Sequence, residues 1–320
     1  MKLPRPGDAL EDRLRVGAMI RENAYMTSFD GVMIRTSRPV AVSFLRVARD
    51  RVNGTLRFLD HVSTRGMLDE PTIAPIVAVG THEDTPWIAI EEVRGKDLDL
   101  VVAEAIEMER PIEVERAVDV TLSILRALQV AHRAGIAHWE LSPWSVAIED
   151  LGDGREATVV LDLGVAHAVR SHLEPGATSE AMRADVRAAA EILLELLTLP
   201  GSTATTCAPD LVELTRASAS IPARYTTATD LALALMTFAG PRSSDLQHRL
   251  REGMHEEHPA LRSMPTSAET PIARAGRSEP PTARQALPAI NVCTRLALAV
   301  LAIGTLLALF VALAPPFGGG

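Results

Sequence analysis

The hydrophobic pattern of the chain changes its period after roughly the first ninety residues. Before that point, short apolar and β-branched runs, which are typical of half-buried strands, cover residues 13–16, 31–35, 40–45, 73–79 and 87–93. After it, apolar residues recur three or four positions apart, on one helix face at 118–132 and again at 186–197. Strands first and helices afterwards predict an α+β fold with two lobes.

Two short motifs lie inside the helical half. Residues 138–146 read HWELSPWSV, and residues 161–164 read LDLG. They resemble the catalytic loop and the metal-binding turn of bacterial Hanks-type serine/threonine protein kinases, H-R-D-L-x-P-x-N-I followed by D-F-G. His138, Leu141 and Pro143 stand where the family has them, but several of the reacting groups do not.

The resemblance continues in order along the chain, over residues 12–239. Further segments resemble the family's third strand, the turn into its fourth strand, its hinge, the helix before the catalytic loop, helix F and the closing R-[YF]-x-[ST]-A motif, at residues 38–45, 70–76, 87–98, 128–138, 184–198 and 221–228. An ordered series of matches is specific, whereas a single match would not be. It implies a bilobal protein-kinase-like domain, with a β-rich N-lobe at 12–93 and a helical C-lobe at 94–239, after an N-terminal tail at 1–11.

The charged and chelating groups of the family are the ones that differ. Glu140 stands at the position of the base aspartate, and Ser145 replaces the metal-binding asparagine. Asp162 keeps the carboxylate of the metal-binding turn, so Glu140 as a base and Asp162 as a Mg²⁺ ligand are the catalytic candidates. His138 and Asp185 match residues that brace the catalytic loop in the family, which implies a retained scaffold.

The nucleotide-binding positions are degenerate as well. Ser43 stands on the family's lysine and carries no charge to neutralise phosphate. His61 falls on the glutamate that pairs with that lysine, or else is an ordinary histidine on a helix surface. The hinge positions Ile90, Glu91 and Val93 would still frame the adenine side.

Of the family's glycine-rich loop, the run at 17–23 retains only the first glycine, Gly17. Side chains in place of the other glycines would crowd the approach of backbone amides to phosphate. Arg21 in this run is either a substitute cation or a solvated arginine at a strand edge.

Two segments that form the peptide-substrate platform of the family are shortened. Twenty residues separate Gly164 from Asp185, where family members have about twice as many, and little room remains for helix G at 198–209. Glu174 is the nearest remnant of the A-P-E motif and would pair with Arg224.

The C-terminal part differs in composition from the rest. Residues 240–292 are rich in Pro, Ser, Arg, Glu and Ala and predict a flexible linker. In the final segment, 293–320, the stretch 296–314 has no charge, and as a helix it would span about 28 Å, close to the thickness of a hydrocarbon core. Arginines on its N-terminal side, such as Arg295, predict a single-pass inner-membrane protein whose N-terminal domain is cytoplasmic.

Composition excludes several other classes. The net charge of −9 argues against broad nucleic-acid binding. Cys207 and Cys293 are far apart and lack CxxC spacing, so neither a disulfide framework nor a zinc site is expected.

The resemblance and the substitutions together imply a membrane-tethered pseudokinase, a signalling scaffold or regulatory binding module with little or no phosphotransfer. Its expected partners are signalling proteins and, through residues 296–314, the lipid bilayer, and no cofactor is expected. Two alternatives stay open: an active, atypical serine/threonine kinase that uses Mg-ATP, and a nucleotide-binding sensor that transfers nothing.

Overall fold

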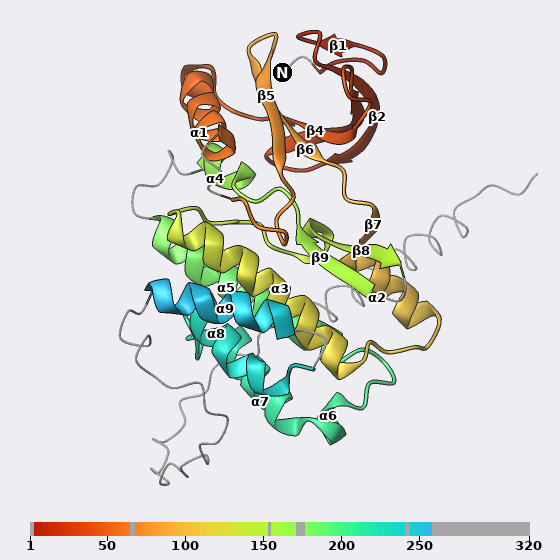
Figure 1. The fold of residues 1–320 in the computed structure, drawn as a ribbon, viewed down its shortest axis with the longest axis vertical. Helices are drawn as coiled ribbons and strands as arrows, with labels where there is room; N and C mark the ends of the chain where they lie inside the picture. The colour runs from red at the N-terminus through yellow and green to blue at the C-terminus, as the bar shows by residue number, and fades with distance from the viewer. Residues whose placement is uncertain (1–2, 65–67, 153–154, 171–176, 241–243, 258–320) are drawn as a thin grey trace, which may run out of the picture. The chain divides into compact units, whose positions relative to one another are not determined.

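The computed structural model of the protein describes residues 3–64, 68–152, 155–170, 177–240 and 244–257. The strands are β1 (Ala9–Leu10), β2 (Leu14–Glu22), β3 (Met26–Met33), β4 (Pro39–Leu45), β5 (Ile76–His82), β6 (Thr85–Glu91), β7 (Gly95–Asp97), β8 (Val146–Gly152) and β9 (Arg155–Val160). The α-helices are α1 (Val52–Thr64), α2 (Leu98–Glu107), α3 (Val114–Arg133), α4 (Val165–Arg170), α5 (Ala177–Leu197), α6 (Ala204–Cys207), α7 (Pro209–Ala219), α8 (Ala228–Leu235) and α9 (Ser244–Glu257). A β-rich lobe lies above a helical lobe in Figure 1, so the predicted α+β arrangement is confirmed.

The upper lobe is a six-stranded antiparallel sheet with α1 beside it. Its strand order is β1-β2-β3-β4-β6-β5. β-Branched and aromatic residues suit β4 to the middle of a sheet, and Val42 and Phe44 are fully buried there with Trp87 of β6. The expected tail at 1–11 is wrong over its last part, because β1 pairs with β2 and Leu10 is buried.

The lower lobe is built around α3 and α5. Apolar residues three and four apart keep one side of α3 buried, including Val118, Leu122 and Leu125. Helix α3 ends at Arg133, and Gly135 just beyond it has a φ of +76°, which suits glycine; the amide of Ile136 donates to the carbonyl of Ala131. This turn directs the chain into the loop at 138–146.

Helix α9 replaces part of the expected linker. The prediction of a flexible segment from residue 240 rested on composition, but residues 244–257 form a helix with Leu246 and Leu250 buried in the main core. Two leucines one turn apart are enough to fix one face of a polar helix, which composition alone does not reveal.

The region expected to be short of helix G contains only the four-residue α6 between α5 and α7. In the described part of the chain, no helix is both long and apolar enough to cross a membrane. The predicted span at 296–314 and most of the linker lie outside the described residues.

Candidate functional site

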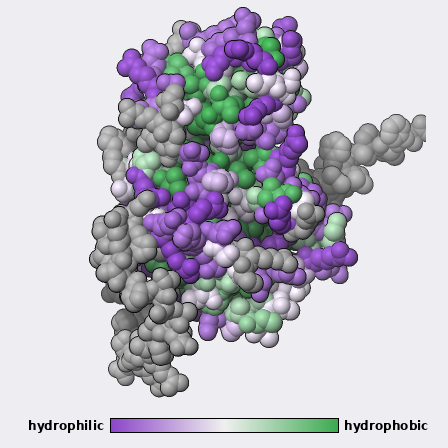
Figure 2. Space-filling model, viewed as in Figure 1, coloured by the Kyte–Doolittle hydropathy of each residue, from purple (hydrophilic) through white to green (hydrophobic). Residues whose placement is uncertain are grey.

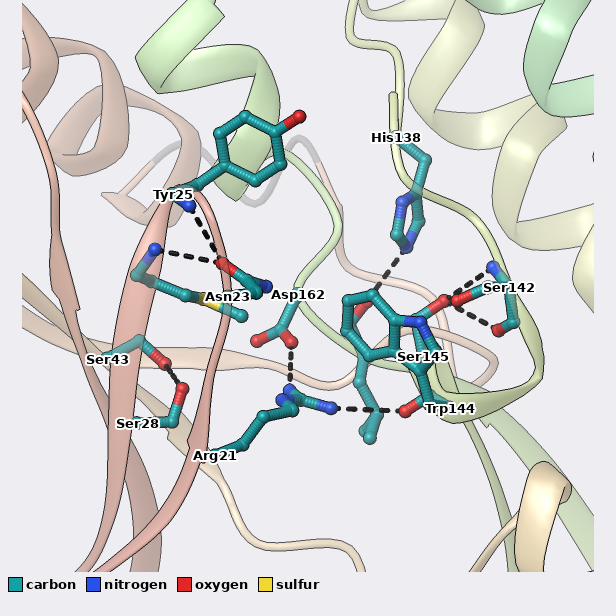
Figure 3. A network of polar contacts seen from close by, with 12 residues as sticks. Arg21, Asn23, Tyr25, Ser28, Ser43, His138, Ser142, Trp144, Ser145 and Asp162 are labelled. Atoms are coloured by element: carbon teal, nitrogen blue, oxygen red, sulfur yellow. Dashed lines mark hydrogen bonds and ion pairs between the residues drawn. The ribbon is translucent and has the colours of Figure 1, made fainter. Parts of the chain in front are cut away.

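The loop at 138–146 and the turn at 161–164 lie side by side between the two lobes, with the β2–β3 hairpin reaching toward them (Figure 3). The hairpin turn follows β2, where the side chain of Asn23 accepts hydrogen bonds from the amides of Tyr25 and Met26. The residues that face the loop are therefore those around this turn, at 21–25.

A buried carboxylate holds the rear of the loop. Asp185 of α5 accepts hydrogen bonds from the amides of His138 at 2.7 Å and Trp139 at 2.9 Å. The ring of His132 on α3 lies 3.0 Å from the same carboxylate. We call these four residues the Asp185 brace. It holds Trp139 at a φ of +72°, a backbone conformation that side chains rarely adopt.

The brace also fixes the metal-binding turn. The ring nitrogen Nε2 of His138 lies 3.1 Å from the carbonyl of Leu161, next to Asp162. His138 and Asp185 thus lie where the sequence placed them, behind the loop rather than in front of it.

The hydroxyl of Ser145 closes the loop upon itself. It donates to the carbonyl of Ser142 at 2.9 Å and accepts from the amide of Ser142 at 3.1 Å, and Ser145 is fully buried. A hydroxyl that is used in this way presents less oxygen to a metal ion than the amide side chain of the family would.

Arg21 binds the one retained carboxylate of the metal-binding turn. Its Nη2 lies 2.5 Å from Oδ2 of Asp162, and its Nη1 donates to the carbonyl of Trp144 at 3.2 Å (Figure 3). The guanidinium also lies 4.5 Å from the centroid of the Trp144 ring. Arg21 is thus partly buried and paired with Asp162, and it is not the solvated arginine at a strand edge that the sequence left open.

The surroundings of this ion pair are acidic. Burial raises the pKa of Asp162, while the neighbouring Arg21 and His138 act to lower it. Burial and the charge of Asp99 raise the pKa of Asp97, and Arg21 opposes that shift as well. Arg21 therefore compensates two carboxylates at once.

Glu140 is held by two residues that the sequence gave no reason to single out. The hydroxyl of Tyr25 donates to Glu140 at 2.6 Å, and Arg170 of α4 donates to the same oxygen at 3.2 Å. Arg170 also lies 4.5 Å from the ring of Trp139. Arg21, Tyr25, Glu140, Trp139, Trp144, Asp162 and Arg170 are called the front cluster below.

Tyr25 and Arg170 were missed because each is far from Glu140 in the chain. Burial raises the pKa of the Tyr25 hydroxyl, and so do the hydrogen bond and the charge of Glu140. The Tyr25 hydroxyl therefore keeps its proton and donates a hydrogen bond to the carboxylate of Glu140.

Ser43 lies in an apolar and hydroxyl environment. It is buried on β4, and its Oγ lies 2.8 Å from Oγ of Ser28 on β3 (Figure 3). Leu59 of α1 is fully buried in the same lobe, whereas His61 is exposed on the outer side of that helix. The placement of His61 on the glutamate position is thus wrong, and the surface reading of that histidine holds.

Gly17, the first glycine of the run at 17–23, lies within β2, ahead of the hairpin turn. The space next to the Cα of Gly17 is limited by a neighbouring side chain. A Cβ there would collide with the carboxylate of Asp30 on the neighbouring strand.

The hinge positions have different surroundings. Ile90 is buried on β6, while Val93 is partly exposed. The amide of Glu91 is already used by the carbonyl of Pro75 at 3.0 Å, and its carboxylate lies 3.8 Å from Arg38. An apolar ring bound here would contact Ile90, but it could not accept a hydrogen bond from the amide of Glu91, which already donates to Pro75.

Arg224 is exposed beside Tyr225, with its guanidinium carbon 5.4 Å from the ring centroid. Glu174, its partner in the sequence prediction, lies outside the described residues. Among the residues that the structure describes, no group of three or more His, Cys, Asp or Glu side chains could hold a metal ion.

No protein-family model matches the chain. In sequence, it is 29% identical over 215 residues to a probable serine/threonine-protein kinase of Corynebacterium efficiens, covering 59% of this chain and 31% of that protein. It is also 28% identical over 216 residues to the serine/threonine-protein kinase PknL of Mycobacterium tuberculosis, covering 61% of this chain and 51% of PknL. The chain is a homologue of bacterial serine/threonine protein kinases. It spans only 31% to 51% of the length of these two relatives.

Solved structures agree on the fold. The PknI kinase domain of Mycobacterium tuberculosis, as a double mutant, superposes with a TM-score of 0.55 at 18% identity, covering 74% of this chain and 100% of that domain. A single mutant of the same domain gives a TM-score of 0.55 at 19% identity. The chain therefore has a protein-kinase-like fold.

A kinase fold implies Mg-ATP, and the residues present do not fit that group. The Asp162 carboxylate is bound by Arg21, the Ser145 hydroxyl is bonded within its own loop, and Ser43 has no charge.

Proposed function

We propose that the chain is a pseudokinase, a kinase-like binding module that regulates or scaffolds signalling proteins and transfers little or no phosphate. The observation that supports this most strongly is the ion pair between Arg21 and Asp162. In phosphoryl transfer the aspartate of this turn holds the metal that neutralises the phosphates. Here a protein cation already satisfies the carboxylate, so a metal would have to displace it.

The state of Glu140 supports the same proposal. A general base must be free to accept the proton of the substrate hydroxyl. Oε1 of Glu140 instead already accepts hydrogen bonds from the hydroxyl of Tyr25 and from Arg170, so it is not free to accept a substrate proton.

The test measures transfer and binding separately. Radiolabelled ATP should give no phosphorylation of the protein or of a generic acceptor above an Asp162→Ala control. Thermal unfolding should show no stabilisation by ATP, with or without Mg²⁺ or Mn²⁺. Autophosphorylation that disappears in Asp162→Ala would establish the active-kinase alternative.

A nucleotide sensor without transfer is the second candidate. It is favoured by the buried apolar Ile90 at the hinge and by the retained Asp162. Stabilisation by Mg-ATP in the absence of any transfer would establish it. In that case Arg21→Ala should change the affinity, because it removes the cation next to the phosphate position.

We also propose that residues 296–314 anchor the protein in the inner membrane, with the kinase-like domain in the cytoplasm. The support is the uncharged, apolar sequence of this stretch and the arginines before it. Such an anchor would raise the local concentration of the module near membrane partners. Resistance to carbonate extraction is the expected result, and full-length protein in the soluble fraction would contradict it.

A further inference from the structure

Helix α9 is joined to the rest of the domain through one buried carboxylate. Glu70 lies in the loop between α1 and β5 and accepts a hydrogen bond from Nε of Arg126 on α3 at 2.9 Å. On the other side, Nη1 of Arg249 on α9 lies 3.2 Å from the second oxygen of Glu70. Arg126 also donates to the backbone carbonyl of Arg249 at 3.0 Å. One carboxylate therefore holds a loop, a central helix and the last described helix together.

The two arginines hold Glu70 with different strength. The side chain of Arg126 is 12% exposed, and both its Nε and its Nη2 reach the carboxylate. The side chain of Arg249 is 34% exposed, and its contact is ionic, without the geometry of a hydrogen bond. A partly solvated ion pair is easier to break than a buried, hydrogen-bonded one, so the contact of α9 is the one that can release.

Packing of α9 is close and directional. Leu250 is fully buried, and the outward side of the molecule over α9 is mainly hydrophilic in Figure 2. A Cβ at Gly253 would collide with the side chains of Gln129 and Arg126 on α3. Gln129 has little freedom to move, because it is buried and its oxygen accepts from Arg126 at 2.8 Å.

A short series of hydrogen bonds leads from Glu70 to the end of β9, which precedes Asp162 of the front cluster. The carbonyl of Glu70 accepts from the amide of Ile73 at 2.8 Å. The next residues pair with β9, since the amide of Ala74 donates to Val160 at 3.0 Å and the amide of Val160 donates to Thr72 at 2.8 Å. Val160 ends β9, two positions before Asp162.

We propose that α9 is a releasable support for β9, the strand that leads to Asp162. When α9 is docked, it holds the Glu70 loop and, through that loop, the end of β9. When it leaves, Glu70 keeps only one of its two arginines and the loop loses a packing partner, so β9 loosens. Because α9 is the last described helix, a partner that binds the chain beyond residue 257, or a force applied there, would act on α9 first. The proposal concerns regulation and does not depend on whether the cleft binds a nucleotide.

The variant Gly253→Ala tests the docking by the sign of its effect. Alanine favours a helix more than glycine does, so an undocked α9 would exchange its amide hydrogens more slowly in the variant. A docked α9 would be pushed off Gln129 and exchange faster. In the full-length protein we expect exchange to accelerate about tenfold both in α9 and at the amides of Ala74 and Val160. The control is Glu252→Ala, an exposed neighbour, which should leave Ala74 and Val160 unchanged.

Arg249→Met tests the ion pair without adding bulk, with Arg251→Met as its exposed control on the same helix. Faster exchange of the amides of Ala74 and Val160 in Arg249→Met, but not in Arg251→Met, supports the proposal that α9 stabilises β9. Wild-type exchange at these two amides in both Gly253→Ala and Arg249→Met overturns it, and so does slower exchange of α9 in Gly253→Ala.

Discussion

The rear and the front of the loop at 138–146 are held by different kinds of group. At the rear, the carboxylate of Asp185 binds two backbone amides, which are present whatever side chains occupy those positions. At the front, Asp162 and Glu140 are bound by the side chains of Arg21, Tyr25 and Arg170. The shape of the loop therefore depends on few residues, whereas the charge in front of it depends on many. A kinase fold can accordingly keep its loop geometry while the chemistry in front of the loop changes.

The largest effect is expected at the rear. Asp185→Ala removes three contacts of a buried carboxylate and leaves two loop amides without partners, so it should lower the free energy of unfolding by about 3–5 kcal/mol. Thermal unfolding of the full-length protein in mild detergent measures this. Asp210→Ala, at an exposed position on α7, is the control. If Asp185→Ala lowered the free energy of unfolding no more than Arg21→Met does, the contrast between the rear and the front of the loop would be lost.

Restoring the family's lysine should damage the N-lobe rather than repair the site. Ser43→Lys places a longer, charged side chain where Ser43 is buried and hydrogen-bonded to Ser28. We expect a loss of about 2–3 kcal/mol in the free energy of unfolding, against about 1 kcal/mol for Ser43→Ala. If Ser43→Lys stayed stable and gained affinity for Mg-ATP, the front would be closer to an active site than proposed.

A smaller effect is expected from Arg21→Met, which leaves the buried Asp162 without its ion pair and should cost about 1–3 kcal/mol. Adding Asp162→Asn should recover part of that loss, because no buried charge then remains unpaired. Arg15→Met, on the same strand and exposed, is the control. Additive effects of Arg21→Met and Asp162→Asn in this cycle would mean that the two residues do not interact.

The smallest effect concerns pH. The folded state raises the pKa of Asp162 through burial, so it holds the proton more tightly than the unfolded state does. The contribution of Asp162 to stability is therefore greatest below the ordinary aspartate pKa and is lost as the pH rises through the raised value. Asp97, Glu191 and Glu195 are shifted in the same direction, each chiefly by burial.

Replacing Asp162 by Asn should thus make the melting temperature fall less between about pH 4 and pH 8. A series of melting curves across this range measures the slope. Asp210→Asn serves as the control. A steeper fall in Asp162→Asn would show that Arg21 outweighs burial in setting this pKa.

Sequence reasoning placed the fold and the rear of the site well. Local patterns with fixed spacing predicted strand β4, helices α3 and α5, and the places of His138 and Asp185. Contacts between distant residues could not be obtained in that way. Tyr25 and Glu140 are 115 positions apart, and no local pattern links them.

The errors have specific physical reasons. The glycine pattern of the run at 17–23 did not indicate the hairpin turn, because the Asn23 side chain caps that turn. His61 was placed by counting along a helix whose register is set by the burial of Leu59. Helix α9 was read as linker because the composition of residues 240–292 was given more weight than the four-residue spacing of Leu246 and Leu250.

The arrangement of tryptophans gives the molecule an internal optical probe. The chain has three, and Trp87 is fully buried in the N-lobe sheet. The other two, Trp139 and Trp144, each carry an arginine guanidinium 4.5 Å above the ring. Indole fluorescence responds to a cation on its face and to the entry of water. Release of Arg21 or Arg170 would consequently change the emission of one indole while Trp87 supplies a constant background, so opening of the front cluster could be followed in real time without a label.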